Sequence, residues 1–183
     1  IKGGQRFQPK KYEVEGDWSA AALHLVAGAL VGRVTVGGLA PDSCQPDRRI
    51  VDVLRAAGAS VGVAETSVTV GTGELKAFYF DATDSPDLFP PLAALACFAD
   101  GLSTIRGVYR LKHKESDRAA ALVEEMSRLG AHLEIRGNVM RIQGGRLEGG
   151  VIDSRGDHRM AMAGAVIGLR AGHGVRVEGH QAV

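Results

Sequence analysis

Residues 85–118 read SPDLFPPLAALACFADGLSTIRGVYRLKHKESDR, and they contain the parts from which the whole chain is built. An aspartate, Asp87, stands before an uncharged run that extends from Leu88 to Ala99. A β-branched segment follows around Ile105, and a cluster of charged residues occupies 110–118. This order predicts an apolar helix, a strand and then a charged loop that leads into a second helix.

The aspartate at the start of this stretch recurs at a fixed interval. Asp17, Asp87 and Asp157 are separated by 87 − 17 = 70 and 157 − 87 = 70 residues. An alanine-rich apolar run follows each aspartate and ends at a glycine, namely Gly32, Gly101 and Gly172. A regular period of this kind indicates that the chain repeats one supersecondary unit.

Each unit is predicted to have the order β-α-β-α-β-β. The first has a strand at 12–14, an apolar helix at 18–31, a strand at 33–36, an amphipathic helix capped by Asp47 and ended by Gly58, and hairpin strands at 60–64 and 67–70. The second has corresponding segments at 75–80, 88–99, 103–106, 118–129, 132–136 and 139–142. The third has a strand at 151–153, an apolar helix at 158–170 and a strand at 175–178, and it is cut short at Val183.

The polarity of these segments predicts an α/β fold that is inside out. The strands alternate, as in Val34-Thr35-Val36, so one face of each sheet should be wet. The first helix of each unit has no polar face, and we expect protein to surround it. Buried helices that run roughly parallel would direct three positive dipole ends to one face of the domain. That face is the predicted anion site.

Composition and charge exclude several classes of function. The chain has 183 residues, 45% of them hydrophobic, and a formal net charge of +1, so a nucleic-acid footprint is not indicated. It shows neither a signal peptide nor an apolar run of about 18 residues, and we read it as cytoplasmic and free of membrane contact. Cys44 and Cys97 are read as two reduced thiols, and the histidine spacing does not support a metal site. Because the sequence starts at Ile1 rather than methionine, we read it as a fragment.

Cations concentrate near the predicted helix starts. They are Arg110, Lys112, Lys114, Arg118 and Arg159. Arginine binds carboxylate and phosphate through two parallel hydrogen bonds, so these positions suit a substrate that carries both groups. The alternative is that neighbouring Lys-Glu and Asp-Arg residues merely pair on a wet surface. Residue spacing leaves the two readings nearly balanced.

The acid–base candidates are Asp87, Glu115 and Asp157. An aspartate before a helix is most often an N-cap, and Glu115 before a helix could simply favour the dipole. Asp87 differs, because Pro90 lacks the N–H that a cap would use and leaves the carboxylate partly available for a ligand. His158 is either a core histidine or a proton shuttle, and its position by itself favours the core.

Four segments bring a known family into view. EGDWSAA at 15–21, Pro86-Asp87, KESDR at 114–118 and DHRMAM at 157–162 together resemble the 5-enolpyruvylshikimate-3-phosphate synthases, in the right order over nearly the whole chain. The family fold implied is an inside-out bundle of β-α-β-α-β-β units with three per domain. The activity implied is transfer of the enolpyruvyl group of phosphoenolpyruvate to the 5-hydroxyl of shikimate 3-phosphate, without a metal or an organic cofactor.

The resemblance also implies roles for individual residues. Asp87 corresponds to the carboxylate that holds and helps to deprotonate the 5-hydroxyl, and Glu115 to the acid–base group near the phosphoenolpyruvate methylene. Arg118 and Arg159 correspond to the pair that clamps its carboxylate. Lys114 corresponds to a contact on the side of the shikimate phosphate.

The remaining correspondences are weaker. Arg110 stands where the family also touches shikimate 3-phosphate, although some members have asparagine there. His158 and Asp157 correspond to residues that support the arginine clamp, with His158 counted among the catalytic candidates. Asp17 corresponds to a residue that supports the site residues without contacting the substrate itself.

Other parts of the family pattern are absent from the chain. The N-terminal lysine-serine-arginine phosphate site, the Ser-Ser-Gln site of the other domain and the lysine after the third unit are missing. The resemblance therefore implies that the chain holds about half of an active site, with the second domain of the polypeptide as its partner. Residues 1–14 are read as a crossing segment or an edge of that partner domain, and 15–183 as two complete units and a truncated third.

Two alternatives remain open from the sequence. The UDP-N-acetylglucosamine enolpyruvyl transferases share the repeat but do not match KESDR or DHRMAM. A non-catalytic anion-binding module could also keep this fold. Intact Asp87, Glu115, Arg118 and Arg159 argue against such a loss of activity.

Overall fold

The computed structural model describes residues 2–6, 8–11, 13–112 and 114–183. The α-helices are α1 (Trp18–Val31), α2 (Ile50–Ala56), α3 (Phe89–Ala96), α4 (Arg118–Arg128) and α5 (His158–Gly168). The strands are β1 (Arg33–Gly37), β2 (Ser60–Val63), β3 (Ser67–Gly71), β4 (Tyr79–Asp81), β5 (Leu102–Arg106), β6 (His132–Arg136), β7 (Val139–Gln143), β8 (Gly150–Asp153) and β9 (Val175–Glu178). Short 3₁₀ turns are η1 (Pro46–Arg49), η2 (Pro86–Leu88), η3 (Val108–Arg110) and η4 (His180–Ala182).

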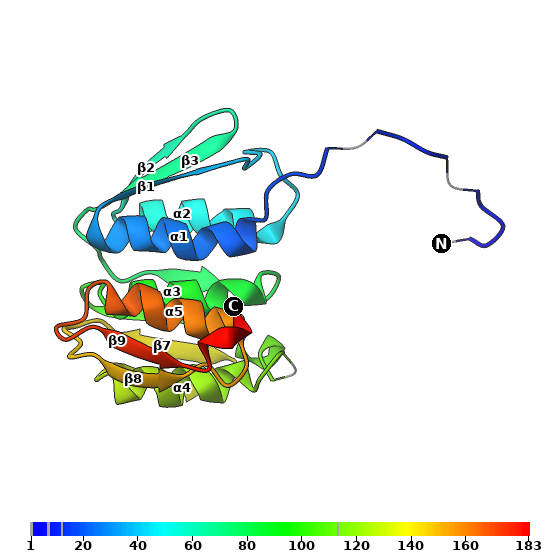
Figure 1. The fold of residues 1–183 in the computed structure, drawn as a ribbon. Coiled ribbons are helices and arrows are strands. Elements are labelled where there is room, and N and C mark those ends of the chain that lie inside the picture. Colours follow the sequence, from blue (N-terminus) through cyan, green and yellow to red (C-terminus); the bar gives the residue numbers. More distant parts are fainter. Residues whose placement is uncertain (1, 7, 12, 113) are drawn as a thin grey trace.

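The helices lie inside and the sheets outside, as the polarity of the sequence predicts. The strand orders of the sheets are β1-β3-β2, β4-β5-β7-β6 and β8-β9. The pairs β4–β5 and β8–β9 are parallel, whereas the hairpin pairs β2–β3 and β6–β7 are antiparallel. The apolar helices α1, α3 and α5 contact one another between the sheets (Figure 1). The alternating exposure along β1 and β5 confirms that each of these strands has one wet face.

The three apolar helices are not equally enclosed. Every residue of α3 is buried. In contrast, α1 and α5 each keep an exposed stripe, which on α1 includes His24 and on α5 includes Ala165 and continues to Leu169 just after the helix. A groove of about 270 Å³ lies between these stripes. No element of the described chain covers these stripes, so α1 and α5 are less enclosed than the fully buried α3.

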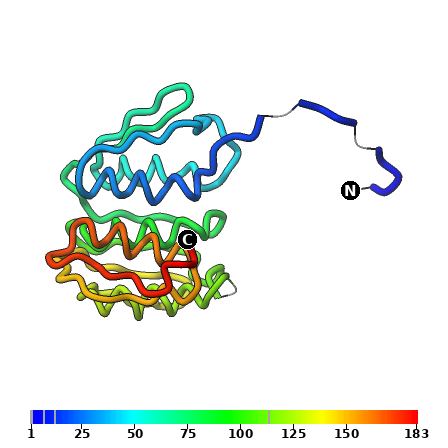
Figure 2. The backbone as a smooth tube through the Cα atoms, viewed as in Figure 1, coloured from blue at the N-terminus to red at the C-terminus, as the bar shows by residue number. Residues whose placement is uncertain are grey.

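Two local predictions also differ from the structure. Glu13 and Val14 belong to no strand, and Tyr12 lies outside the described residues. Residues 2–6 and 8–11 extend away from the rest of the chain (Figure 2), and residues 13–15, which lie beside Gly38 and Leu39, make no strand pairing there. Asp47 is not the cap of α2, because the chain enters α2 through η1 and Asp47 lies inside that turn.

Two further observations concern the cysteines and the membrane. Cys44 is exposed and Cys97 is buried, and neither is in a disulfide among the described residues. Cys97 is buried at the end of α3, and burial raises the pKa of its thiol to about 12. Among the described residues, every helix is too short or too polar to cross a bilayer.

Candidate active site

Most of the predicted site residues lie at or shortly before the starts of α1, α3, α4 and α5. Asp17 and Asp157 are N-caps, since their carboxylates accept hydrogen bonds from the backbone N–H of Ser19 at 2.8 Å and of Arg159 at 2.9 Å. Asp87 is not a cap. It lies within η2, ahead of α3, and its carboxylate makes no capping bond there. The first turn of α3 contains Pro90 and Pro91, which lack a backbone N–H, so few donors are available for a capping bond.

Arg118 is the centre of the cluster and is fully buried at the start of α4. Its Nε donates to Asp157 Oδ2 at 2.9 Å, and its Nη2 donates to Asp157 Oδ1 at 3.1 Å. Nη1 donates to Asp87 Oδ1 at 2.8 Å, and Nη2 also pairs with Glu115. One guanidinium therefore holds three carboxylates, which excludes the reading of Arg118 as a wet surface pair.

Asp87 is shared by several cations. Lys114 Nζ lies 2.9 Å from its Oδ1, and Arg159 Nη2 lies 3.7 Å from its Oδ2, in addition to the bond from Arg118. Partial burial opposes the charge on Asp87, but the hydrogen bond from Lys114 and the positive charges around it outweigh burial and lower the pKa. Asp87 is thus an ionised acceptor near neutral pH, directed toward cations from two other elements.

The other predicted residues are less tightly engaged. Arg159 has only 12% of its side chain exposed, and its one ion pair among the described residues is the 3.7 Å contact with Asp87. His158 is partly exposed, so the reading of it as a core histidine is wrong, because the first turn of α5 lies at the rim of the helix layer. Arg110 is exposed in η3, and no ion pair joins it to the cluster in the described part of the chain.

A carboxylate that the sequence did not single out lies beside this cluster. Asp47 is buried and accepts a hydrogen bond from the hydroxyl of Ser19. Burial raises the pKa of Asp47, and the charges of Asp87 and Arg159 act on it, so the starts of α1, α2, α3 and α5 lie close together. The signal that could have found it is the repeat itself, since Asp47-Arg48 precedes Asp117-Arg118 by 117 − 47 = 70 residues.

Opposite pKa shifts in the cluster predict how its stability depends on pH. Asp157 is buried, and although burial opposes its charge, the hydrogen bond and charge of Arg118 lower its pKa below the unfolded value. The stabilisation of the folded state by ionised Asp157 is fully present above the unfolded pKa of about 4 and is lost as the pH falls through the folded pKa. The effect of Asp47 on stability has the opposite sign. Its pKa is raised in the folded state, so the folded state binds the proton more tightly and loses stability as Asp47 ionises.

We therefore expect the free energy of unfolding to fall steeply as the pH is lowered from about 4 toward 2. The measurement is urea unfolding followed by circular dichroism at several pH values. Asp157→Asn should flatten this acid limb, whereas the exposed Asp84→Asn should leave it unchanged. An acid limb with the same slope in Asp157→Asn and the unchanged protein would contradict the assignment.

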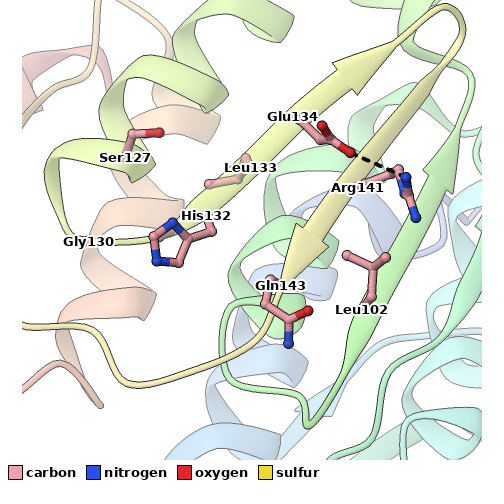
Figure 3. Close-up of a pocket in the computed structure, with 9 residues that line it drawn as sticks. Leu102, Ser127, Gly130, His132, Leu133, Glu134, Arg141 and Gln143 are labelled. Carbon is pink, nitrogen blue, oxygen red and sulfur yellow. Dashed lines mark hydrogen bonds and ion pairs between the residues drawn. The ribbon is translucent and has the colours of Figure 1, made fainter.

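A separate hollow lies on the wet face of the four-stranded sheet (Figure 3). It has a volume of about 490 Å³, and its walls come from β5, β6, β7 and the end of α4. Glu134 of β6 and Arg141 of β7, which face each other on neighbouring strands, pair at 3.3 Å in its wall. None of the predicted site residues is among those that line it, so it is distinct from the cluster around Arg118.

The chain is similar to known proteins over its whole length. The family model described as EPSP synthase (3-phosphoshikimate 1-carboxyvinyltransferase) matches residues 1–183. A 3-phosphoshikimate 1-carboxyvinyltransferase of Aeropyrum pernix is 50% identical over 177 residues, which are 96% of this chain and 42% of that protein. One from Methanopyrus kandleri is 43% identical over 169 residues, covering 92% of this chain and 40% of that protein.

Solved structures give the same result for the fold. The EPSP synthase of Acinetobacter baumannii superposes with a TM-score of 0.79 and 25% identity, over 92% of this chain and 42% of that one. The enolpyruvyl transferase NikO of Streptomyces tendae has a TM-score of 0.66 at 18% identity, over 93% of this chain and 40% of that one, and supports the fold alone. The chain thus spans about 40% of the length of relatives such as that of Methanopyrus kandleri. With a family model that matches from end to end and this inside-out fold, the chain belongs to the EPSP synthase family.

Proposed function

We propose that the longer protein containing this chain transfers the enolpyruvyl group of phosphoenolpyruvate to the 5-hydroxyl of shikimate 3-phosphate and releases phosphate. The observation that carries the proposal is the cluster in which Asp87 meets Lys114, Arg118 and Arg159. It offers fixed cations for anionic substrates and a carboxylate for a hydroxyl group. The relatives are named 3-phosphoshikimate 1-carboxyvinyltransferase, which supports this acceptor over a UDP-sugar.

We assign different acid–base roles to the carboxylates of Asp87 and Glu115. Asp87, whose pKa is lowered, is suited to accept a hydrogen bond from the 5-hydroxyl and to orient it for attack. Glu115 has 44% of its side chain exposed, so it can turn from Arg118 toward a bound ligand. We assign it the proton transfer at the methylene carbon. His158 at the start of α5 and Asp17 at the start of α1 complete the rim of the site.

The cations divide the binding work. Arg159 is more available than Arg118 to bind a substrate carboxylate. Its contact with Asp87 is long, at 3.7 Å, whereas all three guanidinium nitrogens of Arg118 already contact carboxylates. Arg118 can take part in a clamp once Glu115 has turned away, while Asp157 keeps it in place. Lys114 is assigned to the side of the shikimate phosphate, and Arg110 remains a more distant contact of the same substrate.

The domain organisation is part of the proposal. Residues 1–14 would form a crossing segment or an edge of the partner domain, and 15–183 the enolpyruvyl-transferase domain with its third unit incomplete. Since the chain spans about 42% of the Aeropyrum pernix relative, we assign it about half of the active site, in a cytoplasmic enzyme. The chain by itself should show no turnover.

Turnover by the full-length protein tests the function. It is incubated with phosphoenolpyruvate and shikimate 3-phosphate, and phosphate and the enolpyruvyl product are measured. UDP-N-acetylglucosamine replaces the acceptor in a parallel assay, and both are repeated with EDTA. We expect product only with shikimate 3-phosphate, at the same rate with the chelator. Transfer to the UDP-sugar, or no transfer to either acceptor, would exclude the proposal.

The assignment of Arg159 gives a separate prediction. Arg159→Ala in the full-length protein should raise the apparent KM for phosphoenolpyruvate about tenfold or more, because a charge-assisted pair to a carboxylate is lost. The KM for shikimate 3-phosphate should change much less. Arg170→Ala, an exposed arginine just past the end of α5 that lies over Phe98, is the matched control. Equal rises in both KM values would mean that Arg159 only supports the fold.

A further inference from the structure

The turn that leads from β8 into α5 has an unusual backbone. Arg155 has φ 55°, the one positive φ at a non-glycine residue among those described, and Gly156 follows with φ 71°. Such a left-handed conformation is unfavourable for a residue with a side chain and persists where its surroundings hold it. The turn ends at Asp157, directly before His158 and Arg159. Its shape therefore determines where these three residues lie.

A buried carboxylate on another element holds this turn. Glu125 of α4 is fully buried, and its Oε2 accepts the backbone N–H of Asp153 at 3.0 Å. Its Oε1 accepts from Arg155 Nε at 2.9 Å and Nη2 at 2.7 Å. Arg128 adds a bond to Oε2 at 2.8 Å. The hydrogen bonds of such a buried carboxylate fix the positions of its partners, and removal of one partner lowers the stability of the folded protein.

Residues of α4 hydrogen-bond to both ends of the 153–157 turn. Arg118 in the first turn of α4 holds Asp157, and Glu125, seven residues later on the same face, holds Asp153 and Arg155. Seven residues correspond to about two helical turns, or roughly 10 Å along the axis. A rigid helix with two such contacts fixes both the position and the direction of the segment between them.

We propose that Glu125 is a positioning residue: through Arg155 and the 153–156 turn it sets the location of Asp157, His158 and Arg159. The part of the inference that concerns catalysis rests on the proposed enolpyruvyl transfer, whereas the part that concerns the turn does not. Glu125 lies behind the turn and makes its contacts with protein groups, so it acts on the substrate-facing residues only through the backbone.

Amide hydrogen exchange of the full-length protein, without substrate, tests the effect on the turn. The amides of Asp157 and Arg159 are hydrogen-bonded in this structure, to Ser154 O and Asp157 Oδ1. Glu125→Gln should accelerate their exchange about tenfold, while the amides of α3 keep their rates. The control is Glu124→Gln, an exposed partner of the same Arg155, which should change the rates less than about twofold.

A second substitution separates positioning from bulk stability. Glycine adopts a φ of 55° without strain, so Arg155→Gly in the Glu125→Gln background should restore slow exchange at Asp157. In a transfer assay, Glu125→Gln should raise the KM for phosphoenolpyruvate about tenfold and leave that for shikimate 3-phosphate nearly unchanged. Arg155→Gly should reverse that rise.

The outcomes distinguish the two proposals. Unchanged exchange at Asp157, or faster exchange throughout the domain, would overturn the role of Glu125 whether or not the protein is a transferase. Local acceleration in a protein without transfer would leave that role intact and exclude only the proposed function. If Glu125→Gln does not fold, Arg155→Lys tests the same contact from its partly exposed side, with the same expected acceleration.

Discussion

Replacing Arg118 by alanine is expected to lower the free energy of unfolding by about 3–5 kcal/mol. The fully buried guanidinium balances Asp157, which is also fully buried, and the partly buried Asp87. Without it, Asp157 keeps a buried negative charge, and its remaining side-chain hydrogen bonds among the described residues come from the N–H of Arg159 and the hydroxyl of Ser116 at 3.3 Å.

Urea unfolding of Arg118→Ala and the unchanged protein measures this difference. Arg106→Ala is the control, because Arg106 is exposed and pairs with Asp81 at 3.7 Å, a contact worth at most about 1 kcal/mol. We further expect the double variant Arg118→Leu/Asp157→Asn to be more stable than Arg118→Ala, because it leaves no unpaired buried charge. A loss below about 1 kcal/mol in Arg118→Ala would show that water enters the site and solvates Asp157.

Replacing Asp87 by asparagine is expected to lower kcat of the full-length protein by about 10²–10⁴-fold, the usual contribution of a positioned acid or base. Asparagine keeps the shape of the side chain and can still accept a hydrogen bond from Lys114. It loses the negative charge that the surrounding cations stabilise and that would draw a proton from the 5-hydroxyl. The effect should therefore appear in kcat rather than in the KM values.

Steady-state kinetics with both substrates varied measures this effect. Asp84→Asn, an exposed aspartate three residues earlier in the same loop, is the matched control and should retain activity. Thermal unfolding of both variants shows whether the loss of rate exceeds any loss of folded protein. Full activity in Asp87→Asn would transfer the acid–base role to Glu115, and the reading of Asp87 would have to be abandoned.

Much of the fold could be predicted because it depends on local patterns. The 70-residue recurrence of Asp17, Asp87 and Asp157 reveals the repeat, and the uncharged helices between alternating strands reveal that helices lie inside. Periods of about 3.6 and 2 residues are properties of short segments, so they are visible without a structure. The family resemblance of KESDR and DHRMAM predicted that Arg118 and Arg159 share one site, and in the structure both contact Asp87.

Other features could not be predicted, since they depend on which side chains meet. Pattern rules made Asp47 the cap of α2, whereas it is buried against Ser19. Glu125 belongs to a helix with an amphipathic sequence pattern, and yet it is enclosed by Arg128, Arg155 and the start of the next repeat. The chain gives no local sign of such burial, because charged residues at helical spacing usually face water.

The sequence by itself therefore determined the repeat, the helices and strands, their inside-out order and the identity of the charged residues near three helix starts. Only the tertiary structure decided how those charges are shared. Arg118 reaches Asp157, 39 residues away, and Asp87, 31 residues away, and is buried by that arrangement. The physical reason is that burial raises the strength of each ion pair and the cost of each unpaired charge, and burial is a property of the assembled core rather than of any segment.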